Sequence, residues 1–122
     1  MKILIIDDDK ELTGLLKMGL EDFHHQVYIA NDGVIGEEMT MKNEYDVIVL
    51  DVMLPGADGY MVCKTLRKNS VKVPVLMISS LDSPLEERAG FIAGADDYQI
   101  KPFEFEEFHK KIMFLYMRSK LV

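Results

Sequence analysis

The sequence predicts an α/β domain in which one parallel sheet is covered by helices on both faces. Short apolar runs alternate along the chain with stretches whose apolar residues recur at helical spacing, and this alternation is typical of a parallel sheet. Three of the runs are almost wholly apolar, as strands buried on both faces should be. The five expected strands are residues 2–6, 26–30, 46–50, 74–79 and 98–100.

Polar residues in two of these runs predict the order of the strands. Gln26 and Tyr28 lie in the second run, and Tyr98 and Gln99 lie in the fifth, so both runs are expected at the edges of the sheet. The expected order is therefore 2-1-3-4-5. In such sheets ligands bind beyond the carboxyl ends of the strands at the point where the order reverses, here between runs one and three.

The first two helices differ in how strongly their sequences favour them. The first is expected after Asp9, which is placed to cap it. Its apolar face is formed by Leu12, Leu15, Leu16, Gly19 and Phe23. Gly36 disfavours the second helix, expected within residues 32–44, by about 1 kcal/mol relative to Ala.

The later helices have clearer signals. Cys63 lies in an apolar stretch of the third and is expected in the core. Ser83 and Glu86 predict the start of the fourth, with Ser83 as its cap and Glu86 completing a capping box. The apolar stripe of the fifth is Phe105, Phe108, Ile112 and Leu115. Two i,i+4 ion pairs are expected on the fifth helix, Glu106–Lys110 and Glu107–Lys111.

Composition excludes several classes of function. The 122 residues fit one domain, and 48% hydrophobic residues are enough for a globular core. No apolar run approaches the roughly 20 residues of a membrane span, and a single cysteine, Cys63, excludes a disulfide framework. A net charge of −7 disfavours direct DNA binding, because the phosphate backbone attracts basic surfaces. We therefore expect a cytoplasmic protein without membrane contact, which would meet DNA only through another domain.

Charged and hydroxyl side chains follow four of the expected strands. They are Asp7, Asp8 and Asp9 after the first, Asp51 after the third, Ser79 closing the fourth and Lys101 after the fifth. Each of these residues alone is ordinary in a solvated loop or turn. Their joint position at the carboxyl ends of neighbouring strands predicts one shared site.

The chemistry of these side chains narrows what such a site would hold. Carboxylates from adjacent strands repel each other, so a cation is expected to neutralise them. Mg²⁺ binds oxygen ligands and is commonly held by one or two carboxylates plus a phosphate. Lys101 would add a second positive charge, and Ser79 could donate a hydrogen bond to the same anion. The carboxylate of Asp51 is then the candidate nucleophile.

Three other classes of protein fit the residues less well. A flavin-binding flavodoxin needs phosphate-binding donors after the first strand, where this chain has an Asp triplet. A dinucleotide-binding domain needs a glycine-rich turn there. A haloacid-dehalogenase-type phosphatase needs a second Asp two residues after its nucleophile, and Met53 occupies that position. A Mg²⁺-dependent phosphohydrolase using Asp51 remains the alternative function.

The sequence resembles the receiver domain of two-component response regulators over nearly its whole length. The resemblance is carried by "ILIIDDD", "VIVLDVMLPGADGY", "VPVLMISS" and "GADDYQIKPF", in this order and spacing. It implies a flavodoxin-like, doubly wound fold. It also implies a switch, rather than a metabolic enzyme, that catalyses only its own phosphoryl transfer and slow dephosphorylation.

The resemblance assigns a role to each residue of the expected site. Asp51 would be the phosphoacceptor, Asp8 and Asp51 would bind Mg²⁺ together with the carbonyl of Met53, and Asp7 would act mainly through a metal-bound water. Lys101 would pair with Asp51 at rest and later with the phosphoryl oxygens. The peptide bond between Lys101 and Pro102 would be cis. Ser79 would move to the phosphoryl group and Tyr98 would turn inward behind it, which would switch the surface of the fourth helix, fifth strand and fifth helix.

Two departures from the family pattern concern lifetime and dimerisation. Met53 and Leu81 are apolar at the two positions that flank the line of attack on the phosphoryl group, so slow hydrolysis is expected. Family dimers usually pair a basic residue of the fourth helix with an acid of the fifth, but here Glu87 would face Glu107. Arg88 stands where a small apolar contact is usual, while one usual pair, Asp97 and Lys111, is kept. A homodimer through this surface therefore stays open.

The expected partners follow from the same resemblance. A sensor histidine kinase or phosphotransfer protein would supply the phosphoryl group, and the output would most often be transcription. Residues 1–122 are expected to form a single domain, either complete in itself or the N-terminal part of a longer regulator whose output domain contacts DNA. His24 and His25 precede the second strand, away from the site, and we expect them to be solvated rather than metal ligands.

Overall fold

The computed structural model of the protein describes residues 1–121 and confirms a doubly wound, flavodoxin-like α/β fold. Five parallel strands form one sheet in the predicted order β2-β1-β3-β4-β5. The strands are β1 (Lys2–Ile6), β2 (Gln26–Ala30), β3 (Val47–Asp51), β4 (Val75–Ser79) and β5 (Asp97–Ile100). The helices are α1 (Lys10–Asp22), α2 (Gly33–Lys42), α3 (Gly59–Lys68), α4 (Pro84–Ala93) and α5 (Phe105–Ser119). None of these helices combines the length and hydrophobicity needed to cross a bilayer.

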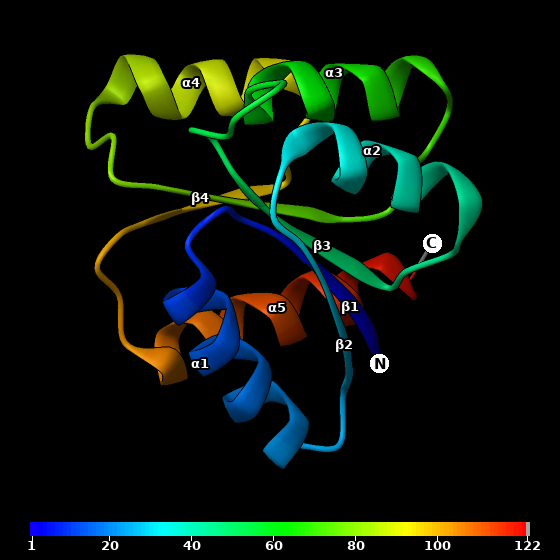
Figure 1. Cartoon of the computed structure of the whole chain (residues 1–122), viewed down its shortest axis with the longest axis vertical. Coiled ribbons are helices and arrows are strands. Elements are labelled where there is room, and N and C mark those ends of the chain that lie inside the picture. Colours follow the sequence, from blue (N-terminus) through cyan, green and yellow to red (C-terminus); the bar gives the residue numbers. More distant parts are fainter. Residues whose placement is uncertain (122) are drawn as a thin grey trace.

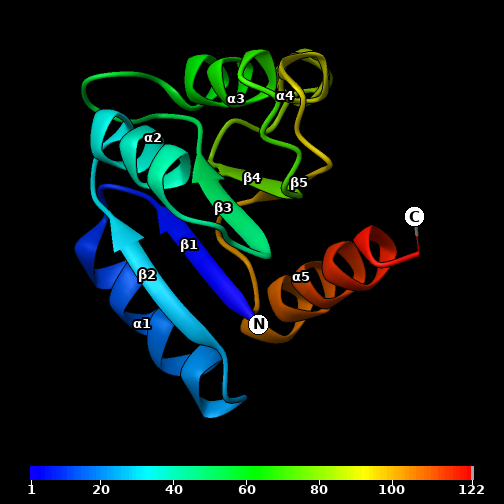
Figure 2. The same ribbon diagram turned by 90° about the vertical axis from the view of Figure 1, so that its right-hand side faces the viewer.

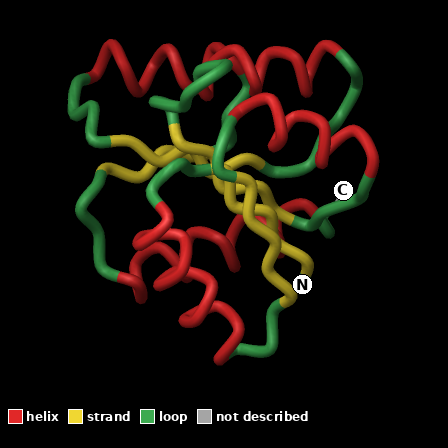
Figure 3. The backbone as a smooth tube through the Cα atoms, viewed as in Figure 1, coloured by secondary structure: helices red, strands yellow, loops and turns green. Residues whose placement is uncertain are grey.

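The helices cover the two faces of the sheet in unequal groups. Figures 1 and 2 show α2, α3 and α4 on one face and α1 and α5 on the other. Figure 3 shows the strands as a central layer between them. Alternate residues of β1 point to opposite faces, so Leu4 and Ile6 join the core under α3, whereas Ile3 and Ile5 pack with α1 and with Phe108 of α5.

The two edge strands are β2 and β5, as their polar residues predicted, but they differ in exposure. Gln26 and Tyr28 of β2 are exposed, as predicted for an edge. In β5, however, Tyr98 and Gln99 are only 4% and 5% exposed, because α4 and α5 close over this edge from both faces. Another difference concerns β3, which extends one residue further than expected and ends with Asp51 itself.

The helix caps follow the sequence more closely than the side-chain pairs do. Asp9 caps α1 by accepting from the backbone N–H of Leu12 at 3.0 Å, and Ser83 caps α4 as predicted. The predicted capping box does not form, because the Glu86 carboxylate instead accepts a hydrogen bond from the Tyr60 hydroxyl at 2.7 Å. Cys63 is fully buried in the core, as expected.

Only one of the two predicted ion pairs of α5 forms. Glu106 and Lys110 lie 3.5 Å apart at the exposed surface. The second predicted pair, Glu107–Lys111, does not form, because both side chains turn toward β5 instead. Lys111 donates to the carbonyl of Tyr98 at 3.1 Å, and Glu107 accepts from the Gln99 amide at 3.3 Å.

Gly36 is required by packing despite its unfavourable effect on α2. A Cβ at this position would overlap three side-chain atoms of Ile6, a fully buried residue of β1. The glycine therefore lets α2 approach the sheet closely. The helix forms because its tertiary contacts outweigh the low propensity of one residue.

We predict that Gly36→Ala lowers the free energy of unfolding by about 1–3 kcal/mol, although Ala is the better helix former. Urea denaturation followed by circular dichroism measures this change. The matched control is Gly14→Ala in α1, where nothing lies within 4 Å of the added methyl group. That variant should be more stable by up to about 1 kcal/mol. A stabilising effect at Gly36 would contradict the packing argument.

Candidate functional site

The three acidic residues expected at the site lie together at the carboxyl ends of β1 and β3. These strands are neighbours in register, with Ile6 opposite Leu50, so the residues that follow them are brought side by side. Asp7, Asp8 and Asp51 each offer one carboxylate oxygen, and these oxygens all lie within 4.8 Å of one another. Asp7 is fully buried and Asp51 is 5% exposed, whereas Asp8 is exposed and opens the cluster to solvent.

Lys101 brings a positive charge to this cluster from the far edge of the sheet. Its ammonium donates to Asp7 Oδ2 at 2.8 Å and lies 3.5 Å from Asp51 Oδ1. The expected pairing with Asp51 is thus present, but the shorter contact is to Asp7. The bond between Lys101 and Pro102 is cis, as expected.

One ammonium does not neutralise two carboxylates that are both removed from water. Burial raises the pKa of Asp51 to about 6, and the negative charge of Asp7 adds to this rise while Lys101 opposes it. Burial alone would lower the pKa of Lys101, but its hydrogen bond to Asp7 and the charges of both carboxylates outweigh this and raise it. Lys101 therefore stays charged, and the cluster is short of positive charge.

Asp9, Asn31 and Gly59 hold these groups in place. Asp7 Oδ1 accepts from the backbone N–H of Asp9 at 2.9 Å, and the Asn31 amide donates to the Asp7 carbonyl at 2.8 Å. A Cβ on Gly59 would overlap the Asp51 carbonyl, so only glycine lets α3 begin this close to the end of β3. Nothing in the sequence marks Asn31, because its role depends on the loop after β2 folding over β1.

Ser79 and Tyr98 lie on the side of the site that faces α4. Ser79 is fully buried at the end of β4, and its Oγ accepts from the backbone N–H of Leu81 at 2.9 Å. The Tyr98 hydroxyl donates to the carbonyl of Leu81 at 3.1 Å, so the ring already lies inward. Leu81 thus contacts both of the side chains that the family resemblance marked as mobile.

The residues present suit a hard divalent cation. Carboxylate oxygens are the ligands that Mg²⁺ prefers, and a bound cation would oppose the burial and the Asp7 charge that raise the pKa of Asp51. Met53 is 59% exposed and, with Asp8, lines an open pocket of about 480 Å³ beside the acidic cluster. Coordination by the Met53 carbonyl stays a prediction.

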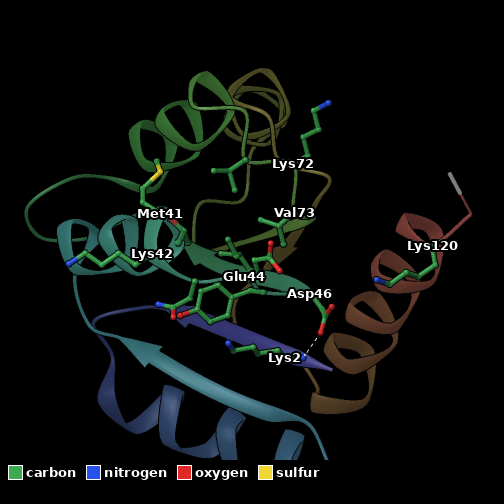
Figure 4. Close-up of a pocket in the computed structure, with 13 residues that line it drawn as sticks. Lys2, Met41, Lys42, Glu44, Asp46, Lys72, Val73 and Lys120 are labelled. Atoms are coloured by element: carbon green, nitrogen blue, oxygen red, sulfur yellow. Dashed lines mark hydrogen bonds between the residues drawn. The ribbon is translucent and has the colours of Figure 1, made fainter.

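A larger pocket, of about 800 Å³, lies at the opposite end of the sheet. Figure 4 shows several lysines around it, but Lys42 and Lys72 point away from each other at its margins. Lys42 is paired with Glu38 at 2.6 Å. Glu44 and Asp46 also line this pocket, so its positive charge is partly cancelled. It has none of the converging groups found at the acidic cluster.

Residues 3–113 match the family described as the response regulator receiver domain. The chain belongs to this family. The receiver domain is 42% identical over 120 residues to the response regulator MprA of Mycobacterium leprae (strain TN), covering 98% of this chain and 53% of that protein. The DNA-binding dual master transcriptional regulator RpaA of Synechocystis sp. (strain ATCC 27184 / PCC 6803 / Kazusa) is 39% identical, with 97% and 50% covered. This receiver domain thus spans about half the length of these curated relatives.

Solved structures give the same result. The receiver domain of Francisella response regulator 1452 superposes with a TM-score of 0.93 at 37% sequence identity, covering 97% of this chain and 98% of that one. Members of the family are regulatory switches that bind Mg²⁺ at an acidic pocket and interact with histidine kinases. The acidic cluster at Asp7, Asp8 and Asp51 lies where the strand order of this receiver domain reverses.

The raised pKa of Asp51 predicts a pH-dependent change in stability. The folded protein holds the Asp51 proton more tightly than the unfolded chain does, so its contribution to stability is lost as pH rises from about 4 through about 6. Asp51→Asn removes this loss. In the absence of divalent cations it should raise the Tm at about pH 8, and the gain should shrink toward pH 4.

Thermal unfolding of both proteins across this pH range measures the difference. The matched control is Asp58→Asn, which makes the same exchange at the exposed N-cap of α3. Asn caps helices about as well as Asp, so little change is expected. A variant at residue 51 that is less stable than the wild type at about pH 8 would show that Lys101 outweighs burial and Asp7.

Proposed function

We propose that this receiver domain accepts a phosphoryl group on Asp51 from the phosphohistidine of a sensor histidine kinase or phosphotransfer protein. The observation that supports this most directly is the position of Asp51. Its carboxylate ends a buried strand, 3.5 Å from the Lys101 ammonium and beside two further carboxylates. Such a group is shielded from water on one side and open toward Asp8 and Met53 on the other.

The proposed reaction is a displacement at phosphorus. An oxygen of Asp51 attacks the phosphorus atom, the bond from phosphorus to the histidine nitrogen breaks, and that nitrogen keeps the electron pair. Asp51 must be ionised to attack, and a pKa of about 6 leaves it so at neutral pH. Lys101 is then placed to shift from Asp7 to the new phosphoryl oxygens, which carry roughly −1.5 to −2 charges.

We assign the cation to the same residues. Asp8 and Asp51 would bind Mg²⁺ with the Met53 carbonyl, and Asp7 would act mainly through a metal-bound water. When bound, Mg²⁺ neutralises the carboxylates and the phosphoryl oxygens. A cation would reach this pair from the side of Asp8, which is exposed and lines the adjacent pocket, whereas Asp51 is buried behind it.

The proposed switch runs from Ser79 to α4. A phosphoryl group on Asp51 would draw the Ser79 hydroxyl toward it and away from the backbone N–H of Leu81. The Leu81 carbonyl in turn accepts a hydrogen bond from the Tyr98 hydroxyl. A movement of Leu81 would therefore change the position of the buried Tyr98 ring of β5. A Cβ on Gly90 of α4 would lie 3.1 Å from this ring, which is tighter than ordinary van der Waals contact. The surface formed by α4, β5 and α5 would respond.

The output of this switch is proposed from the relatives rather than from the chain itself. Relatives about twice as long include a DNA-binding transcriptional regulator. We propose that residues 1–122 act as the receiver domain of such a regulator in the cytoplasm, with DNA contacted only by a further domain. A homodimer through α4, β5 and α5 stays open, since Glu87 and Glu107 are both exposed while Lys111 and Glu107 are already bound to β5.

Incubation with a small-molecule phosphodonor and Mg²⁺ tests the function. We expect one phosphoryl group per chain, stable to acid and labile to base, because an acyl phosphate forms on Asp51. Asp51→Asn should abolish it, whereas the control Asp58→Asn should keep it. Intact-protein mass spectrometry measures the modification. Many turnovers of the donor without a stable adduct would instead support the alternative, a Mg²⁺-dependent phosphohydrolase that uses Asp51.

The apolar residues beside the site predict a long-lived phosphoryl group. Met53 and Leu81 cannot orient an attacking water by hydrogen bonding. Replacing both by polar residues, Met53→Asn with Leu81→Glu, should speed dephosphorylation by at least about tenfold, since positioned polar groups contribute this much or more. Loss of the adduct over time measures the rate. The control is Met53→Leu, which keeps the position apolar, and an unchanged rate in the double variant would refute the explanation.

A further inference from the structure

Two of the three histidines of the chain meet on the face opposite α3 and α4. His25 precedes β2 and His109 lies in α5, and their Nε2 atoms are 3.1 Å apart although 84 residues separate them in sequence. The expectation that His25 is solvated was therefore wrong. It is half-buried, because the packing of α1 against α5 brings His109 over it, while His24 is exposed as expected.

Aromatic rings hold this histidine pair in position. The Phe23 ring lies 4.3 Å from the His109 ring, centroid to centroid, and the Phe105 ring stacks against His109 at 5.7 Å. Phe105 is itself packed against α1, where a Cβ on Gly19 would overlap its ring. The two imidazoles are therefore constrained before any ligand arrives, and neither is a freely rotating surface side chain.

We propose that His25 and His109 bind a divalent transition-metal ion such as Zn²⁺ through their Nε2 atoms, with water completing the coordination. With metal–nitrogen bonds of roughly 2.0–2.1 Å, two ligating nitrogens lie about 2.9 Å apart at a right angle and about 3.3 Å apart at the tetrahedral angle. The observed separation of 3.1 Å falls between these values. Small rotations of the two rings, which are tilted by 59°, would aim both lone pairs at one ion.

The protonation of the pair favours a metal near neutral pH. Burial, followed by the Met1 ammonium and the other two histidines, lowers the pKa of His25, and burial lowers the pKa of His109. Both rings are thus neutral, the form that ligates. His25 Nδ1 lies 3.1 Å from the Met1 amino nitrogen.

The histidine pair would select against Mg²⁺, the cation proposed for the acidic cluster. Imidazole nitrogens prefer Zn²⁺, Ni²⁺ and Cu²⁺, whereas Mg²⁺ prefers the carboxylates of Asp7, Asp8 and Asp51. The only cysteine, Cys63, is fully buried and does not compete as a thiolate. The inference does not rest on phosphoryl transfer, because it uses none of the residues at the acidic cluster.

Isothermal titration of the full chain with Zn²⁺, in saturating Mg²⁺, tests the site. We expect one Zn²⁺ per chain, and His25→Gln and His109→Gln should each weaken binding by at least about tenfold. The matched control, His24→Gln, removes an adjacent imidazole and should leave the affinity unchanged. Absence of binding, or an equal loss in the control, would overturn the proposal and leave the pair as a hydrogen bond alone.

A second measurement on the wild-type protein needs no variant to fold. With only three histidines, the imidazole ring signals are resolved by NMR. Zn²⁺ should shift the rings of His25 and His109 together, saturating at one equivalent, and should leave His24 in place. Zn²⁺ should also raise the Tm, because it binds only the folded state. A shift confined to His24 would overturn the proposal.

Discussion

The balance of charge among Asp7, Asp51 and Lys101 is the constraint on which the rest of this molecule depends. Two carboxylates that are almost without water share one ammonium, at 2.8 Å and 3.5 Å. That ammonium belongs to Lys101, which is 94 positions from Asp7 in the chain, so only the complete sheet brings the three groups together. A single charge cannot satisfy both acids, which leaves a site that gains from a bound cation.

In the proposed switch, this incomplete balance would connect the site to the helical surface beside it. Lys101 has two alternative acceptors, and Ser79, Leu81 and Tyr98 form a continuous series of hydrogen bonds leading away from Asp51 toward α4. Gly59 and Gly90 place α3 and α4 close to this series, because Gly59 has no room for a side chain and a Cβ at Gly90 would fit only tightly. In the proposed switch, a change of charge at Asp51 would therefore meet packed neighbours rather than flexible loops.

Much of the fold and most of the acidic cluster could be predicted from the sequence. The strand runs were right to within one residue, and the convergence of the acids with Lys101 followed from their position after strands that point the same way. Predictions failed where a side chain had a choice of partners. Glu86 binds Tyr60 instead of completing a cap, and Lys111 binds the Tyr98 carbonyl instead of Glu107. The predicted partners lie within one helical turn, whereas the observed partners are 26 and 13 residues away in the chain and are brought close only by the fold.

The sequence by itself determined the alternation of elements, the order of the strands and the end of the sheet that carries the chemistry, because local apolar periodicity sets which faces are buried. Only the tertiary structure decided which carboxylate lies nearest Lys101, that β5 is covered at its edge, and that His25 meets His109. Those features depend on the directions of side chains from segments far apart in the chain, and no local pattern contains that information.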